Sequence, residues 1–369
     1  VLSAGGIVHP RTAKVVPLGA EARAVLRIDD EEPTPSEVIR AILSAPVDLL
    51  YFGGIGTYVR ASTEDDDDVD DRANTDLRVE GRDLRARVVG EGANLAMTQR
   101  ARIEVARRGA RINVDAIDNA AGVDCSDHEV NLKVLLARAE TEGLIDRAER
   151  DALLERHVED VVASVLSDCA SQSDALDRAE RGAPDDMAGT VAVLRLLVAE
   201  GALDPEVEAL PSEDEVQARV QAGAGFTRPE LAVLLAGLKR RVSDQILASE
   251  VPDRPVVRDA LVGYFPPDVA VRFDDVLDRH RLRRELIASE VANDMVDHLG
   301  PRRVVALTSE LGATVPELAI AYWVARGVLR APERWRRMSR ERAAAVPDLI
   351  GDPIDGGDVL AEVLGSLTR

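Results

Sequence analysis

The sequence is short of several residue types, and each shortage excludes a class of protein. Its 369 residues include two cysteines, Cys125 and Cys169, and no Cys-x-x-Cys spacing, which excludes a disulfide framework and a cysteine-based zinc site. No run approaches the roughly 18 apolar residues of a membrane-spanning helix, and no basic-then-apolar signal pattern opens the chain. We therefore expect a cytoplasmic protein that does not enter the membrane.

Positive charge is also scarce, with 46 Lys and Arg residues against 67 Asp and Glu residues and a net charge of -21. An acidic surface repels the phosphates of nucleic acids and anionic membranes, so neither is expected as a partner. Aromatic residues make up only 3% of the chain, and its cores must be built from aliphatic side chains. The first residue is Val rather than Met, and we expect the chain to lie within a longer polypeptide.

Helix and strand patterns alternate over residues 34–140, which is typical of a parallel, doubly wound sheet. A capping box at Thr34 opens an amphipathic helix, and a second helix is predicted from Thr98 to Gly109. Short buried strands are predicted at 47–52, 84–90 and 110–118. A loop follows the third strand, and Ser126 and Asp127 are predicted to begin the next helix, as either an N-cap or a ligand contact.

From residue 141 onward the apolar residues recur at helical spacing, and no strand pattern is convincing. Two more capping boxes, at Thr227 and Thr314, open helices in this region. The sequence thus predicts an α/β part at 1–140 and an all-helical domain at 141–369.

Four groups of charged or reactive residues each have an ordinary structural role as the alternative to a functional one. The run TEDDDDVDD at 63–71 lacks the spacing and central glycine of an EF-hand and predicts a solvated, mobile loop. Cys125 and His128 are of the types that form a nucleophile pair, but an inert buried cysteine is the commoner case. The other four histidines form no metal-ligand spacing, so no metal site is predicted. The stretch RHRLRRE at 279–285 predicts solvated or ion-paired arginines, with an allosteric anion site as the alternative.

Small residues follow the three predicted strands, in the segments GGIGT, GEGAN and DNAAGVDCS. Ligands of open α/β sheets bind beyond the carboxyl ends of the strands, where glycine and alanine let a flat ligand approach the main chain. Asn94 and Asn119 each offer a donor and an acceptor for a carboxamide or a ribose hydroxyl. Tight turns are the alternative explanation of each segment taken alone.

No G-x-G-x-x-G turn is present, so the phosphate-binding element of a dinucleotide fold is not in this chain. The fold class predicted is therefore the second half of a doubly wound, Rossmann-like dinucleotide-binding domain, followed by the helical domain.

Taken together, these motifs resemble the glutamate dehydrogenase family, and most closely its large bacterial NAD-specific members. The resemblance is carried by five segments and spans about residues 1–340: PVDLLYFGGIGTYV, VVGEGANLAMTQRA, INVDAIDNAAGVDCSDHEVN, FTRPELAVLLA and RHRLRRELIASEVAND. It implies NAD as cofactor, L-glutamate and 2-oxoglutarate as substrates, and a homo-oligomer built by the full-length chain.

The resemblance also implies roles for individual residues. The asparagine that matches Asn94 faces the nicotinamide and its ribose in the family, next to Gly92 and Ala93, and the one that matches Asn119 holds the carboxamide. The positions of Gly53 and Gly54 lie near the adenosine-side ribose. Those of Val123 and Ser126 line the glutamate pocket, where the serine donates to the side-chain carboxylate.

The sequence departs from the family in ways that bear on activity. None of the three lysines, Lys14, Lys133 and Lys239, has the context of the catalytic lysine, so no catalytic residue is assigned and the chain alone is expected to be inactive. Phe52 replaces a polar amide, and Ala4 replaces a lysine. A non-catalytic regulatory or oligomerisation module with a vestigial nucleotide-binding half is the alternative function.

Overall fold

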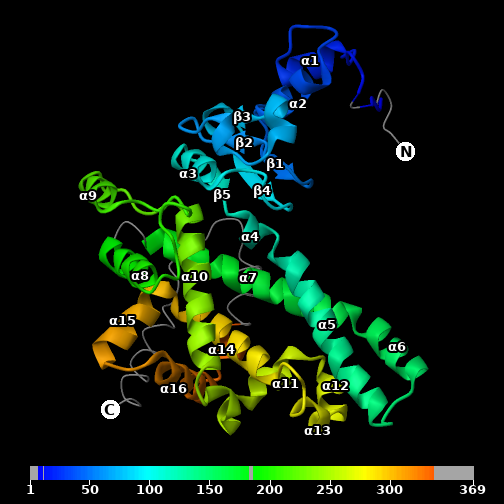
Figure 1. Ribbon diagram of the computed structural model, residues 1–369, viewed down its shortest axis with the longest axis vertical. Helices are drawn as coiled ribbons and strands as arrows, with labels where there is room; N and C mark the ends of the chain where they lie inside the picture. The colour runs from blue at the N-terminus through cyan, green and yellow to red at the C-terminus, as the bar shows by residue number, and fades with distance from the viewer. Residues whose placement is uncertain (1–6, 11, 183–185, 336–369) are drawn as a thin grey trace. The chain divides into compact units, whose positions relative to one another are not determined.

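The computed structural model describes residues 7–10, 12–182 and 186–335, and the chain divides into two compact units (Figure 1). The first unit consists of Val1–Ala120 with two later segments, Glu206–Pro211 and Thr227–Val233. The second consists of Ala121–Pro205, Ser212–Phe226 and Leu234–Arg369. Ala4, whose identity departs from the family pattern, lies outside the described residues.

A three-stranded parallel sheet forms the centre of the first unit, with the order β1 (Leu49–Phe52), β4 (Val88–Glu91) and β5 (Arg111–Ile112). Leu50 pairs with Val89, and Val89 pairs with Ile112. All three side chains are buried in one hydrophobic cluster, because alternate residues of a strand point to the same face of the sheet. The first two predicted strands are confirmed at their carboxyl ends.

The third predicted strand is wrong beyond Ile112, because a short helix α4 (Asp115–Asp118) begins three residues later. The carboxylate of Asp115 accepts a hydrogen bond from the backbone N–H of Ala116, and that of Asp118 accepts one from Glu91. Aspartates that bond nearby backbone donors favour helix starts and turns over strands. The predicted loop after this strand is also helical, because α4 is followed directly by α5 (Ala120–Thr141).

The two connections within the sheet differ from each other. Strands β4 and β5 are joined by α3 (Gln99–Arg107), which Thr98 caps and after which Gly109 adopts a φ of 96°, as predicted. Between β1 and β4 no α-helix occurs among the described residues, which corrects the expected alternation. Instead the chain forms a two-stranded parallel sheet, β2 (Val59–Arg60) and β3 (Val79–Glu80), and three 3-10 turns at Asp66–Asp68, Arg72–Leu77 and Gly81–Asp83.

The sequence predicted that the acidic run at 63–71 is a solvated loop, and this prediction is wrong for part of the run. Asp66 pairs with Arg78 at 2.8 Å and with Arg60 at 3.3 Å, and the hydrogen bond from Arg78 holds the pKa of this carboxyl below its usual range. Asp71 accepts the backbone N–H of Thr57 at 2.7 Å. Since the guanidinium of Arg78 is almost completely buried, the acidic run supplies counter-charge that burial of an arginine requires.

Two further helices belong to the first unit, α1 (Ala20–Leu26) and α2 (Pro35–Leu43). The predicted capping box at Thr34 and Glu37 is present at the start of α2. Leu43 at the end of α2 is buried against the cluster that fills the space around the sheet, so this helix helps to cover β1.

The second unit is helical throughout its described residues, as predicted (Figure 1). In addition to α5, its helices are α6 (Arg147–Arg156), α7 (Val158–Gly182), α8 (Met187–Ala199), α9 (Glu213–Gln221), α10 (Arg228–Leu247, which starts in the first unit), α11 (Arg258–Tyr264), α12 (Pro267–Arg272), α13 (Asp274–Leu277), α14 (Arg283–Leu299), α15 (Pro301–Leu311) and α16 (Val315–Val328), with 3-10 turns at Val251–Asp253 and Pro255–Val257. The predicted capping box at Thr314 is present. At the one predicted for Thr227, the Glu230 carboxylate accepts a hydrogen bond from the backbone N–H of Thr227, which is one of the two bonds of a capping box.

The central helix of the second unit is α14, which packs against α7, α11, α15 and α16. The arginines at and just before its start are ion-paired, since Arg283 and Arg284 both contact Asp253 and Arg279 contacts Glu142. The ion-paired interpretation of 279–285 is confirmed.

No single described helix is long and apolar enough to cross a membrane, and α15 and α16 pass that test only as a pair bent by 111°.

Candidate functional site

The carboxyl ends of β1 and β4 bring the small-residue segments of the first unit together. The backbone N–H of Ala93 donates to the carbonyl of Phe52 at 3.0 Å, which joins the end of one strand to the segment after the other. Gly53 and Gly54 are exposed beyond β1, and Gly92 and Ala93 follow β4. Four of the predicted residues therefore lie at one edge of the sheet.

Two asparagines from different segments meet at this edge. The amide Nδ2 of Asn119, at the end of α4, donates to Oδ1 of Asn94 at 2.7 Å. This pairing leaves the Nδ2 group of Asn94 and the Oδ1 atom of Asn119 to bind a ligand, because an amide has both donor and acceptor atoms. One free donor and one free acceptor are what a carboxamide needs for recognition.

The backbone between these segments is held by two side chains that no sequence motif had indicated, those of Asp115 and Thr57. Leu95 adopts a φ of 63°, a left-handed conformation that is unfavourable for a branched residue. Its N–H donates to Asp115 Oδ2 and its carbonyl accepts from Thr57 Oγ1, both at 2.8 Å. These bonds fix the turn that presents Asn94.

A buried ion pair lies directly beneath the same turn. The guanidinium of Arg102 donates two hydrogen bonds to Glu91, at 2.7 and 2.9 Å, and pairs with Asp115 at 3.2 Å. Glu91 is fully buried, and this burial raises the pKa of its carboxyl above the usual range although Arg102 opposes the shift. The ion pair joins α3 to the last residue of β4, so it links the sheet to the turn.

The ring of Tyr51 lies against the glycines of β4. A Cβ atom built on Gly92 would be 1.7 Å from Tyr51 Oη, and one built on Gly90 would be 3.2 Å from its Cδ2. Tyr51 pairs with Gly90 in the sheet and its side chain is 64% exposed. In this structure the absent side chain at Gly92 therefore makes room for the tyrosine ring.

A pocket of about 280 Å³ borders the end of β1. It is lined by residues of α2, β1 and the following segment: Ile39, Leu43, Tyr51, Phe52, Gly53, Gly54, Tyr58 and Leu77. Its aromatic and aliphatic walls suit a flat, apolar ring more than a charged group. Phe52, which replaces a polar amide of the family pattern, contributes to these walls.

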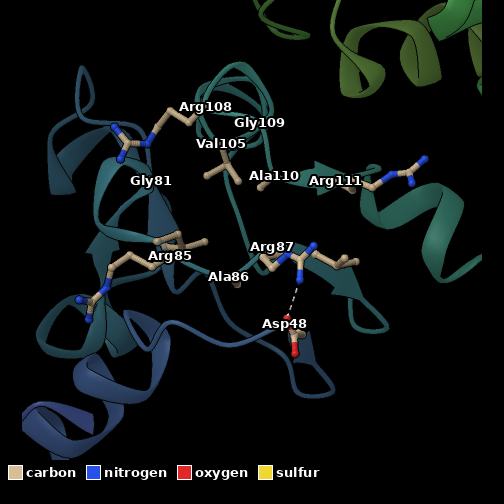
Figure 2. Close-up of a pocket in the computed structure, with 12 residues that line it drawn as sticks. Asp48, Gly81, Arg85, Ala86, Arg87, Val105, Arg108, Gly109, Ala110 and Arg111 are labelled. Carbon is tan, nitrogen blue, oxygen red and sulfur yellow. Dashed lines mark hydrogen bonds and ion pairs between the residues drawn. The ribbon is translucent and has the colours of Figure 1, made fainter. Parts of the chain in front are cut away.

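A larger pocket, of about 810 Å³, lies at the opposite edge of the sheet, where the strands begin (Figure 2). Four arginines line it, and one of them, Arg87, pairs with Asp48 at 3.1 Å. Figure 2 shows the other three, Arg85, Arg108 and Arg111, extending in different directions. Because these side chains do not converge, and because ligands of open α/β sheets bind at the carboxyl edge, we place the candidate site at the smaller pocket and the asparagine pair.

The remaining predicted residues belong to the second unit. Val123 and Ser126 are exposed on α5, and Ser126 Oγ donates to the carbonyl of Gly122 at 3.3 Å. The sequence predicted that Ser126 starts a helix. This prediction is wrong, because α5 already begins at Ala120. Cys125 is a free, half-buried thiol, and no hydrogen bond joins it to His128 among the described residues.

Comparison with known proteins gives consistent results over both units. The family model described as "Bacterial NAD-glutamate dehydrogenase, catalytic domain" matches residues 1–179, and the one described as "Glutamate dehydrogenase, C-terminal" matches residues 223–347. Three similar relatives are named "NAD-specific glutamate dehydrogenase".

The relative from Mycobacterium tuberculosis is 41% identical over 358 residues, which are 95% of this chain and 22% of the relative. Those from Halomonas elongata and Pseudomonas aeruginosa are 41% and 43% identical over 338 residues, which are 92% of this chain and 21% of each relative. The chain thus spans about a fifth of the length of the curated relatives it matches.

Proposed function

Since the chain belongs to the bacterial NAD-specific glutamate dehydrogenase family, we propose that it supplies the nicotinamide side of an NAD-binding domain in a glutamate dehydrogenase. The reaction is the oxidative deamination of L-glutamate to 2-oxoglutarate and ammonia. The observation that carries this proposal is the pairing of Asn94 with Asn119 at the carboxyl edge of parallel strands.

The residues at this edge fit the cofactor by their chemistry. We assign the free amide atoms of Asn94 and Asn119 to the carboxamide and ribose of the nicotinamide. Gly92 and Ala93 allow that ring to approach the main chain. Gly53 and Gly54, beside the apolar pocket at the end of β1, are assigned to the adenosine-side ribose.

The chemistry is divided between the cofactor and the protein. When bound, NAD would supply the acceptor for the hydride that leaves the α-carbon of glutamate, and loss of an amine proton to solvent would leave the substrate as its imine. Val123 and Ser126 are assigned to the substrate, with the serine hydroxyl donating to the side-chain carboxylate. Water then hydrolyses the imine of the substrate to 2-oxoglutarate and ammonia.

The sheet supports a proposal for the organisation of the domain. Among the described residues β1 pairs only with β4, and its other edge is free to pair with a further parallel strand, as a Rossmann-like domain completed by another part of the polypeptide requires. We assign residues 1–140 to this domain and 141–369 to a helical C-terminal domain, so α5 counts with the first domain along the chain although its contacts place it in the second compact unit. The full-length enzyme is proposed to be a cytoplasmic homo-oligomer, and the two free cysteines of this chain fit a reducing compartment.

The 369-residue chain by itself is expected to form no NADH from glutamate, because none of its lysines has the context of a catalytic base. The native polypeptide, detected in source cells with an antibody to this region, is expected to be far heavier than 39.8 kDa and active. Glutamate-dependent NADH formation by the chain alone would contradict its dependence on other segments. A native species near 39.8 kDa without activity would favour the regulatory or oligomerisation module instead.

Asn119→Ala in the native polypeptide is expected to raise the KM for NAD about fivefold to tenfold, the equivalent of one lost neutral hydrogen bond. The KM for glutamate should change much less, because the amide is assigned to the cofactor. The matched control is Gln217→Ala, which removes an exposed amide from α9 and should change neither constant. Equal KM values for NAD in the two variants would remove Asn119 from the cofactor site.

A further inference from the structure

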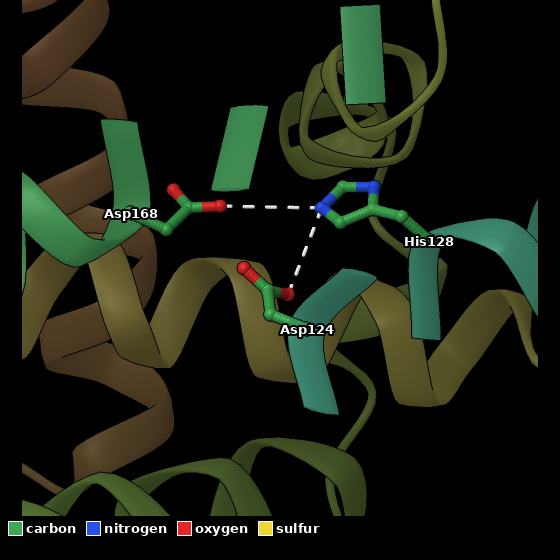
Figure 3. A group of neighbouring side chains, drawn as sticks. All are labelled: Asp124, His128 and Asp168. Carbon is green, nitrogen blue, oxygen red and sulfur yellow. Dashed lines mark ion pairs between the residues drawn. The ribbon is translucent and has the colours of Figure 1, made fainter. Parts of the chain in front are cut away.

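Two helices of the second unit bring a histidine and two aspartates together (Figure 3). Asp124 and His128 lie one turn apart on α5, and Asp168 lies on α7. Nε2 of His128 is 3.7 Å from Asp124 Oδ1 and 4.0 Å from Asp168 Oδ2. Figure 3 shows both carboxylates turned toward the same ring nitrogen. One nitrogen and two oxygen atoms therefore surround a single point.

The histidine is buried and oriented for this point by its surroundings. His128 is 6% exposed, and its ring stacks on Tyr264 with centroids 4.1 Å apart and planes 11° from parallel. Tyr264 is itself fixed by a hydrogen bond from Asn131 at 3.1 Å. In the described part of the chain neither ring nitrogen of His128 makes a hydrogen bond, and the partners of its Nε2 are the two aspartates.

Negative charge is crowded around the same place. Burial, with the nearby carboxylates of Asp168, Asp294 and Asp124, raises the pKa of Glu290 to about 8, and burial likewise raises the pKa of Asp124. The neighbouring cations are already paired, Lys239 with Asp297 at 2.7 Å and Arg326 with Asp294 at 3.0 Å. The group thus has more carboxylates than cations to neutralise them, and a bound metal ion relieves such an imbalance.

We propose that Asp124, His128 and Asp168 bind one divalent transition-metal ion that joins α5 to α7. One imidazole and two carboxylates suit Zn²⁺ or Mn²⁺ better than the all-oxygen preference of Mg²⁺ or Ca²⁺. The three ligand atoms lie within 4.8 Å of one another. Metal–ligand bonds of about 2.0–2.2 Å place tetrahedral ligand atoms about 3.3–3.5 Å apart, so small rotations of the two carboxylates complete the site.

The position of the site indicates what the ion would do. Asp124 lies between Val123 and Ser126 on the first turns of α5, and Asp168 provides the ligand from α7. An ion bound at both helices fixes the turn of α5 on which the proposed substrate residues lie. The metal site itself does not depend on the dehydrogenase assignment, because it rests on the geometry of the second unit alone.

The test is to titrate the metal-stripped 369-residue chain with MnCl₂ or ZnCl₂. Uptake of Mn²⁺ is followed by the loss of the electron paramagnetic resonance signal of the free ion, and that of Zn²⁺ by the rise in Tm that a ligand of the folded state produces. We expect one ion per chain. Asp168→Asn, at an exposed side chain whose substitution should change stability little, is expected to weaken binding by about 100-fold or more, since even indirect partners of metal ligands contribute 10- to 100-fold.

Asp127→Asn is the matched control, because it makes the same change at an exposed position on α5 beside His128. This variant should bind the ion as the unmodified chain does. Equal binding by Asp168→Asn and Asp127→Asn would overturn the proposal. So would the absence of saturable uptake below about 1 mM, which would leave His128 as an ion-pair bridge between the two aspartates. Asp124→Asn gives a second variant, so a folding defect in one does not decide the result.

Discussion

Arg102→Met is expected to lower the free energy of unfolding by about 3–5 kcal/mol, the cost of removing one partner from a buried ion pair. The guanidinium holds Glu91 through two hydrogen bonds and contacts Asp115. Methionine fills much of the arginine volume, so the loss is mainly one of charge and hydrogen bonds. Without its partner the buried Glu91 carboxyl must take up a proton or remain as an uncompensated charge. Urea unfolding at neutral pH measures the change.

Arg100→Met provides the comparison on the same helix. Arg100 is exposed on α3, and its replacement should change stability by less than about 0.5 kcal/mol. Adding Glu91→Gln to Arg102→Met should recover part of the loss, because the double variant no longer buries an unpaired charge. If Arg102→Met and Arg100→Met destabilise the protein equally, the pair does not hold the end of β4, and the support assigned to the Asn94 turn must come from elsewhere.

Gly92→Ala is expected to weaken NAD binding by the native polypeptide about 10- to 100-fold. The added methyl group falls within 1.7 Å of Tyr51 Oη, so the exposed tyrosine ring must move away. The methyl group also occupies the surface on which the nicotinamide is proposed to lie, and crowding of a well-packed surface by one methyl group costs about 1–3 kcal/mol. The KM for NAD and direct binding of NAD both report this effect.

A second substitution separates the two explanations for the glycine. In Tyr51→Ala/Gly92→Ala the ring that blocks the methyl group is gone. If Gly92 serves the cofactor, the double variant stays deficient in NAD binding relative to Tyr51→Ala. Full recovery would mean that the glycine only makes room for Tyr51, and Gly92 would leave the cofactor site. Gly327→Ala, on α16 with no atom within 4 Å of the new Cβ, is the control and should bind NAD normally.

Local signals in the sequence were enough to predict many elements of this fold. Thr34, Thr98 and Thr314 cap helices where expected, because a cap depends on residues only three positions apart. The apolar strands β1 and β4 were found for the same reason, since a short run of buried residues identifies a central strand without knowledge of its partners. The resemblance to the family was equally local, because it rests on short motifs at the strand ends.

The sequence misled where distant residues decide the structure. The acids at 63–71 looked like a solvated run, but Asp66 neutralises a buried arginine twelve positions away, as the contact between Asp66 and Arg78 shows. The third strand was drawn too long because the aspartates of VDAID bond the backbone of β4 and of the turn after it. Ser126 was placed at a helix start because nothing local shows that α5 begins at Ala120.

The sequence by itself determined the parallel strands, the helical second part and the small residues at the strand ends, because these depend on composition and on spacing along the chain, and its short motifs carried the resemblance to the family. Only the tertiary structure decided that Asn94 and Asn119 share a hydrogen bond, that Arg102 neutralises Glu91 beneath them, and that Asp168 faces His128. Each of these pairs joins separate elements, and their proximity follows from how strands and helices pack rather than from any pattern that neighbouring residues form.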